Sequence, residues 1–203
     1  MAKGRIYRRI EIRKAAPGDA ALFSELLLIS SPLFPVVFGK GIDKALEHCF
    51  VRTSNVFSHE YVSIAEVDGK AAGMLLGYSW QKKYEHTFIT GWMLIMELGI
   101  SVVERIPAII ESGRVSGTVN EGEYYISNVA TLPDFRGMGV GSALLAHAEK
   151  LALGCGANTI ALEVDRKNAG ALRLYKKSGY EVQKEFSIDI DGRKSFYRMI
   201  KKL

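Results

Sequence analysis

The sequence contains little cysteine and no recognisable metal-binding motif. Only two cysteines, Cys49 and Cys155, occur in 203 residues, and they lie far apart without CxxC spacing. The four histidines show neither HExxH nor paired-ligand spacing. These absences exclude a disulfide framework and argue against a zinc site, so we expect no metal. Both cysteines have apolar neighbours, and we expect them to be small core residues of a protein in a reducing compartment.

A long, uncharged apolar run is also absent. The most apolar stretch, residues 92–110, is interrupted by Glu97, Glu104, Arg105 and Pro107, which makes a membrane-spanning helix too costly. Residues 1–14 are charged throughout and lack the apolar centre of a signal peptide. With 48% hydrophobic and 24% charged residues, the composition is that of a globular protein. We therefore expect a cytoplasmic protein with no membrane partner and one domain over residues 1–203.

The charge does not keep one sign along the chain, although the net charge is +5 and the pI is near 9.1. Residues 1–14 carry a net +5, residues 15–165 a net −7 and residues 166–203 a net +7. A uniformly cationic surface, as expected for nucleic-acid binding, is therefore not indicated. Only the basic N-terminal arm favours that alternative.

The hydrophobic periodicity predicts an α+β fold. Alternating or continuous apolar runs predict strands at 6–14, 61–67, 70–78, 124–130, 159–165, 181–189 and 195–200. Helical spacing predicts helices after Pro17 and at 42–52, 138–153 and 169–177, with one or two more within a segment of about 80–122. Two Asp-Gly pairs, at 68–69 and 191–192, predict hairpin turns. Because most strand pairs are joined by short turns, we expect a mixed, mostly antiparallel sheet flanked by helices.

A glycine-rich turn between a strand and a helix is the most informative motif. It reads VATLPDFRGMGVGSALL over residues 129–145. Glycines at alternate positions let backbone N–H groups converge on a ligand, and the helix that follows adds its unpaired donors and positive dipole end. These features favour phosphate binding, with Arg136 adding a charge, although a turn that needs glycine only for packing is the simpler alternative. A Rossmann dinucleotide site is disfavoured, because Pro133 to Phe135 separate strand from glycines and repeated βαβ units are absent.

These residues resemble the acetyl-CoA signature of the GNAT superfamily of N-acetyltransferases, whose Arg/Gln-x-x-Gly-x-Gly/Ala core is matched by Arg136, Gly139 and Gly141. A second block, LEVDRKNAGALRLYKKSGY at 162–180, is similar to the ribosomal-protein N-terminal alanine acetyltransferases. The resemblance implies the GNAT (acyl-CoA N-acyltransferase) fold, with a helical insertion at about 80–122 between the hairpin and the cofactor-binding strand. It is close over residues 123–182, whereas residues 1–78 agree only in pattern.

The resemblance also implies a binding site for acetyl-CoA (coenzyme A). Its pyrophosphate would lie on the backbone of the glycine turn. Its pantetheine arm would pair with the strand before that turn, which diverges from the strand after the helix. The backbone N–H of Val129 would polarise the thioester carbonyl. Asn168 would bind the cofactor arm, or cap the helix that follows it, or both. The implied cofactor-binding residues are Val129, Ala130, Thr131, Arg136, Gly137, Met138, Gly139, Val140, Gly141, Ser142 and Asn168.

By the same resemblance, Tyr175 would be the general acid that protonates the departing thiolate, and Glu163 the general base, with Glu123 and Glu121 as further candidates for the base. The implied function is transfer of an acetyl group to a primary amine of a small molecule or protein by direct attack. The alternative is a non-catalytic acyl-CoA-binding sensor or partner protein. The insertion could cover a peptide groove and decide the acceptor, or form the interface of a homodimer.

Overall fold

The structure, a computed structural model, describes residues 9–113 and 119–203, so residues 6–8 of the first predicted strand lie outside the described part. The strands are β1 Ile10–Lys14, β2 Val62–Val67, β3 Lys70–Ser79, β4 Glu123–Thr131, β5 Thr159–Asp165, β6 Glu181–Asp189 and β7 Arg193–Lys202. The helices are α1 Ala20–Ser30, α2 Phe34–Phe38, α3 Ile42–Val51, α4 Trp80–Leu98, α5 Ile106–Gly113, α6 Val140–Gly154 and α7 Ala169–Lys177. Short 3₁₀ turns occupy Pro17–Asp19, His59–Tyr61, Gly99–Arg105 and Pro133–Phe135.

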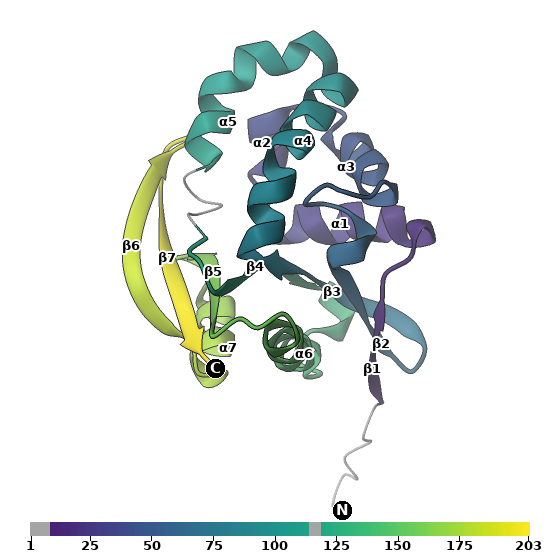
Figure 1. Cartoon of the computed structure of the whole chain (residues 1–203), viewed down its shortest axis with the longest axis vertical. Coiled ribbons are helices and arrows are strands. Elements are labelled where there is room, and N and C mark those ends of the chain that lie inside the picture. The colour runs from purple at the N-terminus through teal and green to yellow at the C-terminus, as the bar shows by residue number, and fades with distance from the viewer. Residues whose placement is uncertain (1–8, 114–118) are drawn as a thin grey trace, which may run out of the picture.

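The described strands form one sheet in the order β1-β2-β3-β4-β5-β7-β6. All neighbours pair antiparallel except β4 and β5, which are parallel. The helices α1 to α5 lie on one side of the sheet, and α6 and α7 lie on the other (Figure 1). The predicted α+β class, with a mixed, mostly antiparallel sheet flanked by helices, is therefore confirmed.

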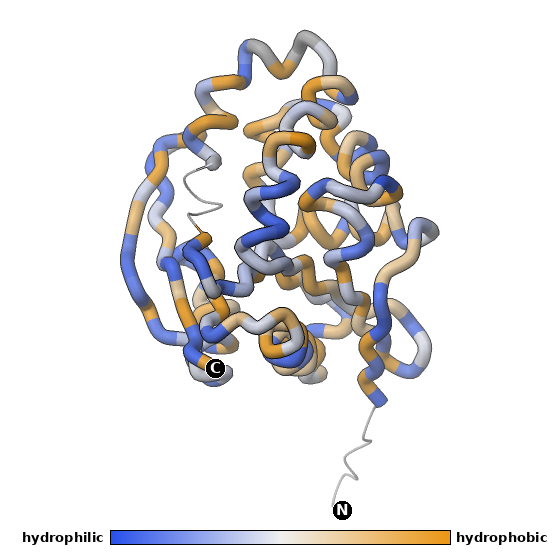
Figure 2. The backbone as a smooth tube through the Cα atoms, viewed as in Figure 1, coloured by the Kyte–Doolittle hydropathy of each residue, from blue (hydrophilic) through white to orange (hydrophobic). Residues whose placement is uncertain are grey.

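Both predicted hairpin turns have the expected backbone. Asp68 and Gly69 have φ of 51° and 75°, and Asp191 and Gly192 have φ of 50° and 86°. Positive φ at both central residues is what a type I′ hairpin requires, and Asp-Gly is among the pairs that accept it readily. These turns set β2 against β3 and β6 against β7. The edge strand β6 is mostly hydrophilic (Figure 2), as is common for strands at the edge of a sheet.

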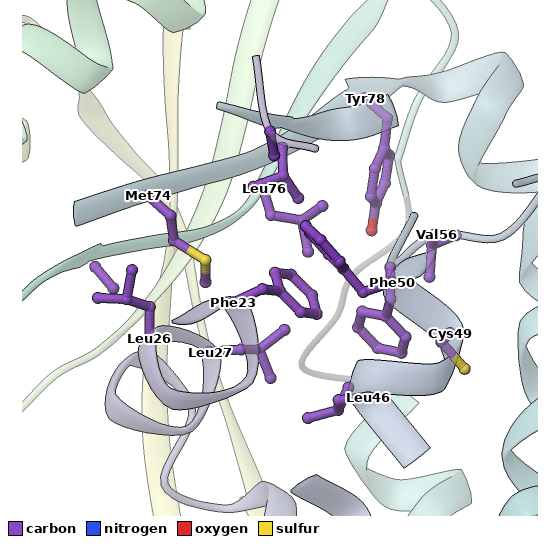
Figure 3. Close-up of a cluster of buried hydrophobic side chains, with 14 of the residues drawn as sticks. Phe23, Leu26, Leu27, Leu46, Cys49, Phe50, Val56, Met74, Leu76 and Tyr78 are labelled. Carbon is purple, nitrogen blue, oxygen red and sulfur yellow. The ribbon is translucent and has the colours of Figure 1, made fainter. Parts of the chain in front are cut away.

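Two apolar clusters hold the helices on the two faces. On the first face Phe23, Leu27 and Phe50 from α1 and α3 pack against Met74, Leu76 and Tyr78 of β3 (Figure 3). On the second face α6 and α7 cover the sheet through Leu144, Leu145, Tyr175 and the adjoining Tyr180. These four helices are therefore held mainly by burial against the sheet.

Apart from shifts of one or two residues at the ends of several strands, the structure differs from the sequence predictions in three places. The predicted break after α1 contains the short helix α2, with Pro35 in its first turn, where proline is tolerated. The helix predicted from Met138 begins at Val140 because Gly139 adopts a left-handed conformation. Cys49 is buried as expected, but the expectation for Cys155 is wrong: it is exposed at the end of α6.

The predicted insertion consists of α4, the 3₁₀ segment and α5. It begins directly after β3, and it reaches across to β6, where Glu111 Oε1 accepts a hydrogen bond from the Asp189 backbone N–H at 3.4 Å. No helix within the described residues is long and apolar enough to cross a membrane. The outer face of α4 exposes large apolar side chains, with Phe88 82%, Met96 66% and Trp92 59% exposed. The predicted homodimer interface in this segment stays a prediction.

Candidate functional site

The strands β4 and β5 pair over only three residues and then diverge. Their pairs are Glu123 with Thr159, Tyr124 with Ile160, and Tyr125 with Ala161. Beyond these, β4 pairs only with β3 and β5 only with β7 among the described strands. The pairing of β3 with β4 also shifts after Leu76, which leaves Ser127 as the extra residue of a bulge. The expected splay is therefore present, and it opens an unpaired edge on each strand.

The unpaired edge of β4 presents polar backbone atoms from two predicted cofactor-binding residues. Leu132 N donates to Ala72 O at 2.9 Å, so this N–H points toward β3. Backbone groups alternate in direction along a strand, so those of Ala130 also point toward β3, whereas those of Val129 and Thr131 point toward the gap. Of the three predicted strand residues, Val129 and Thr131 are the two that can pair with a ligand through their backbone.

The glycine turn leads from this edge into α6. Gly137 and Gly139 have φ of 77° and 92°, a conformation that residues with a Cβ rarely adopt. Gly139 is the residue before the first turn of α6, whose leading N–H groups have no carbonyl within the helix to receive them. The side chains of Arg136 and Ser142 are exposed, while Val140 is buried and can offer only its backbone.

Gly141 has a different reason to be glycine. A Cβ at this position would lie 2.8 Å from Leu174 Cδ2, so the missing side chain lets α6 approach α7. Close packing of two helices therefore explains the glycine at 141, whereas a positive φ explains Gly137 and Gly139. The close approach brings the N-terminal turn of α6 near α7, whose cap is Asn168. Asn168 Oδ1 accepts from Ala171 N at 3.0 Å, so the predicted capping interaction is present.

Tyr175 lies on the α6 and α7 side of the sheet. It is buried and packs against Tyr180 with ring centroids 5.9 Å apart. Burial raises the pKa of the Tyr175 phenol to about 12. Its hydroxyl has no hydrogen-bond partner among the described residues, and it is not one of the fully enclosed polar atoms. The phenol is therefore a protonated donor that remains available to a ligand.

Glu163 lies on the other face of the sheet, on β5 just beyond the divergence. Its side chain is 4% exposed, and its Oε1 accepts from Arg198 Nη1 at 2.8 Å. Its Oε2 is buried and has no hydrogen-bond partner among the described residues. Burial raises the pKa of the Glu163 carboxyl, and the nearby Tyr125 hydroxyl, Arg198 and Lys83 oppose that rise. One carboxylate oxygen is therefore held by Arg198, and the other is enclosed without a hydrogen bond from the described part of the chain.

Arg198 joins Glu163 to a second carboxylate. Its side chain is 2% exposed, and it donates to Glu163, to Glu123 Oε2 at 2.6 Å and to Gln183 Oε1 at 2.8 Å. Gln183 reaches it from the extra position of a bulge in β6. Glu123 also accepts from Asn120 N at 2.8 Å and Nδ2 at 2.9 Å, so both of its oxygens are engaged. Glu121 is exposed. The three candidate bases thus differ in their surroundings within the described residues: Glu163 has one oxygen without a hydrogen bond, both oxygens of Glu123 accept hydrogen bonds, and Glu121 is exposed.

The sequence motifs do not point to Arg198, Gln183 or Lys83. A signal for Arg198 was present, because alternation in β7 places it on the same face as Phe196 and Ile200. Lys83 Nζ lies over the Tyr125 ring, 5.2 Å from its centroid, and 5.9 Å from that of Tyr78. Within the described residues, no group of three or more His, Cys, Asp or Glu side chains could hold a metal ion.

Comparison with known proteins agrees with this geometry. Residues 100–180 match the family described as Acetyltransferase (GNAT) family. A curated relative from Arabidopsis thaliana, GCN5-related N-acetyltransferase 4, chloroplastic, is 42% identical over 59 residues, which are 29% of this chain and 20% of that protein. Alignments with four curated relatives span between 20% and 54% of those relatives' lengths.

Two solved structures share the fold. An N-acetyltransferase from Staphylococcus aureus Mu50 has a TM-score of 0.72 at 21% identity, with 94% of this chain and 99% of that chain covered. The PaiA N-acetyltransferase from Thermoplasma acidophilum, in complex with coenzyme A, has a TM-score of 0.52 at 16% identity, with 96% and 99% covered. The family match over residues 100–180 and the shared fold confirm the resemblance indicated by the motifs, and the chain has the GNAT fold.

Proposed function

We propose that the chain is an N-acetyltransferase that transfers an acetyl group from acetyl-CoA to a primary amine of a small molecule or protein by direct attack. The observation that carries this proposal is the gap between β4 and β5. It has polar backbone atoms on its β4 edge, the glycine turn on one face and a buried carboxylate with an unpartnered oxygen on the other. A binding site with a proton donor, here Tyr175, and a proton acceptor, here Glu163, is suited to amine acylation.

The residues around the gap fit an acyl-CoA molecule. The backbone N–H groups of Gly137 and of residues 139–142, with the positive end of the α6 dipole, would hold phosphate oxygens, whereas the Arg136 and Met138 N–H groups already donate within the turn. The outward backbone atoms of Val129 and Thr131 would pair with amide groups of the pantetheine arm. The Asn168 side chain keeps its Nδ2 donors, since only its Oδ1 is used for capping. Bound there, acetyl-CoA supplies an activated thioester.

Three groups of the chain would then carry the proton transfers. Glu163 Oε2 would accept the proton that the amine loses, and a carboxyl with a raised pKa is a better base than an ordinary one. Tyr175 would donate its proton to the thiolate that forms. The Val129 N–H would stabilise charge on the carbonyl oxygen. Glu123 is a poorer candidate base, because both of its oxygens already accept hydrogen bonds.

The test is release of CoA thiol in the presence of polyamines, amino acids, aminoglycosides and peptides, combined with CoA titration by calorimetry. Glu163→Gln and Tyr175→Phe should each lower turnover by about a hundredfold or more while CoA affinity stays close to that of the parent. Glu25→Gln, at an exposed position on α1, is the matched control and should leave turnover unchanged. CoA binding without thiol release with any amine would instead favour the non-catalytic acyl-CoA-binding alternative.

A further inference from the structure

We propose that Lys83 is an internal acceptor and that the chain acetylates its own Lys83 amine. This inference rests on the proposed function, because it uses the same acyl donor, base and acid. It adds a modification site to the chain and identifies a primary alkyl amine on the protein as a substrate.

Lys83 reaches the gap from α4, on the face of the sheet that carries Glu163. Its Nζ lies 5.2 Å from the ring centroid of Tyr125. Tyr125 and Ala161 form the last pair before β4 and β5 diverge, and Glu163 follows Ala161 by two residues on the same face of β5. The amine and the carboxylate are therefore held at the same end of the gap by two different elements. Such preorganisation favours an intramolecular reaction over attack by an amine from solution.

The surroundings of Lys83 also favour its neutral, nucleophilic form. The side chain is half-buried over two aromatic rings, and this burial lowers the pKa of the Lys83 amine, with Glu163 opposing the change. Glu163 Oε2 is buried without a hydrogen-bond partner among the described residues, so it can receive a proton from this amine. The pKa of the neighbouring Lys82 amine changes in the opposite direction: it is raised by the hydrogen bond that Lys82 Nζ donates to the exposed Glu85 at 2.7 Å.

The reaction balances without any further reactant. The Lys83 ammonium loses one proton to become a neutral amine, and its lone pair attacks the acetyl carbonyl carbon of acetyl-CoA. The new C–N bond forms as the C–S bond breaks, and the thiolate takes a proton from Tyr175. The nitrogen loses its second proton to Glu163, and transfer of that proton through solvent to the Tyr175 phenolate returns both groups to their starting forms. The products are acetyl-Lys83, CoA thiol and one proton released to solvent.

The experiment uses the full chain with acetyl-CoA and no added amine, followed by intact mass and peptide mapping. We expect one acetyl group per chain, located on Lys83, at a rate that does not change when the protein is diluted. Lys83→Arg should abolish the modification, the matched control Lys82→Arg should leave it unchanged, and Glu163→Gln should slow it by about a hundredfold. Mapping of the parent chain does not depend on any variant folding correctly.

Two results would overturn the inference and leave the proposed function intact. One is thiol release with an external amine while Lys83 stays unmodified. The other is acetyl groups spread over the exposed lysines at a rate proportional to protein concentration. A failure to bind acetyl-CoA by calorimetry would overturn both this inference and the proposed function.

Discussion

Replacing Arg198 by methionine should destabilise the fold strongly, and the loss should depend on pH. Arg198 is 2% exposed and is the shared partner of Glu123 and Glu163, whose side chains are 7% and 4% exposed. Methionine fills much of the same volume but leaves two buried carboxylates without their counter-charge. Breaking a buried ion pair by removing one partner costs about 3–5 kcal/mol. We expect a loss of that size in the free energy of unfolding at neutral pH.

The pH dependence follows from the direction of the pKa change. Burial already raises the pKa of Glu163, and Arg198 is one of the groups that limit the rise. Without the guanidinium, the folded-state pKa of this carboxyl moves further above its unfolded value of about 4.3. A carboxyl whose pKa is raised by folding destabilises the native state fully above the folded-state pKa, and this cost disappears as the pH falls below the unfolded value. The difference between variant and parent should therefore shrink on acidification.

Urea unfolding of parent and Arg198→Met, at mildly alkaline and at mildly acidic pH, measures this difference directly. The matched control is Arg166→Met, whose partner is Glu185 at 2.8 Å with side chains 57% and 43% exposed. That surface pair should contribute no more than about 1 kcal/mol. A loss below about 1 kcal/mol for Arg198→Met, or an equal loss at both pH values, would refute the reasoning from a buried, shared guanidinium.

Three further predictions concern the glycine turn and the acid. Gly141→Ala should lower the free energy of unfolding in urea by about 1–3 kcal/mol, because its Cβ would lie 2.8 Å from Leu174 Cδ2. Leu174→Ala in the same chain should recover part of that loss. If the effects of the two substitutions simply add, the clash is not the cause. Gly139→Glu should weaken CoA binding severely in calorimetry, since it adds a negative side chain at a position with φ of 92°; unchanged affinity would remove the glycine turn from the binding site. Because burial raises the pKa of Tyr175 to about 12, ionisation of this phenol should not lower kcat/KM across the neutral and mildly alkaline range. A fall of kcat/KM in that range that disappears in Tyr175→Phe would contradict a buried, protonated phenol.

Local signals explain why so much of the fold could be predicted from the sequence. The two Asp-Gly turns impose hairpins through backbone conformation alone, and they set the pairing of four of the strands. The strand Thr159–Asp165 and the helix Ala169–Lys177 have the predicted bounds, because Asn168 caps that helix from its own sequence neighbourhood. Where the prediction placed the start of α6 two residues early, the reason is also local: Gly139 is left-handed.

The part of the site that could not be predicted depends on contacts between residues far apart in the chain. Arg198 meets Glu163 because β5 and β7 pair in one register, and it meets Gln183 because a bulge in β6 adds a residue at that level. Neither the register nor the bulge has a signature that periodicity reveals. Lys83 is likewise an ordinary helical lysine until α4 is laid over Tyr78 and Tyr125.

The hydrogen bonds of three glutamates favour one of them as the general base, which the motifs leave open. Glu163, Glu123 and Glu121 all lie near the start of a strand or within one, and sequence alone ranks them only by resemblance. In the fold, both oxygens of Glu123 accept hydrogen bonds from Asn120 and Arg198, while Glu121 is exposed to solvent. Glu163 is buried with one oxygen fixed by Arg198 and the other unpartnered within the described residues, an arrangement that is costly for stability alone. The cost is understandable if that oxygen is needed to receive the proton of an amine, which supports Glu163 as the proposed base and Arg198 as the residue that orients it.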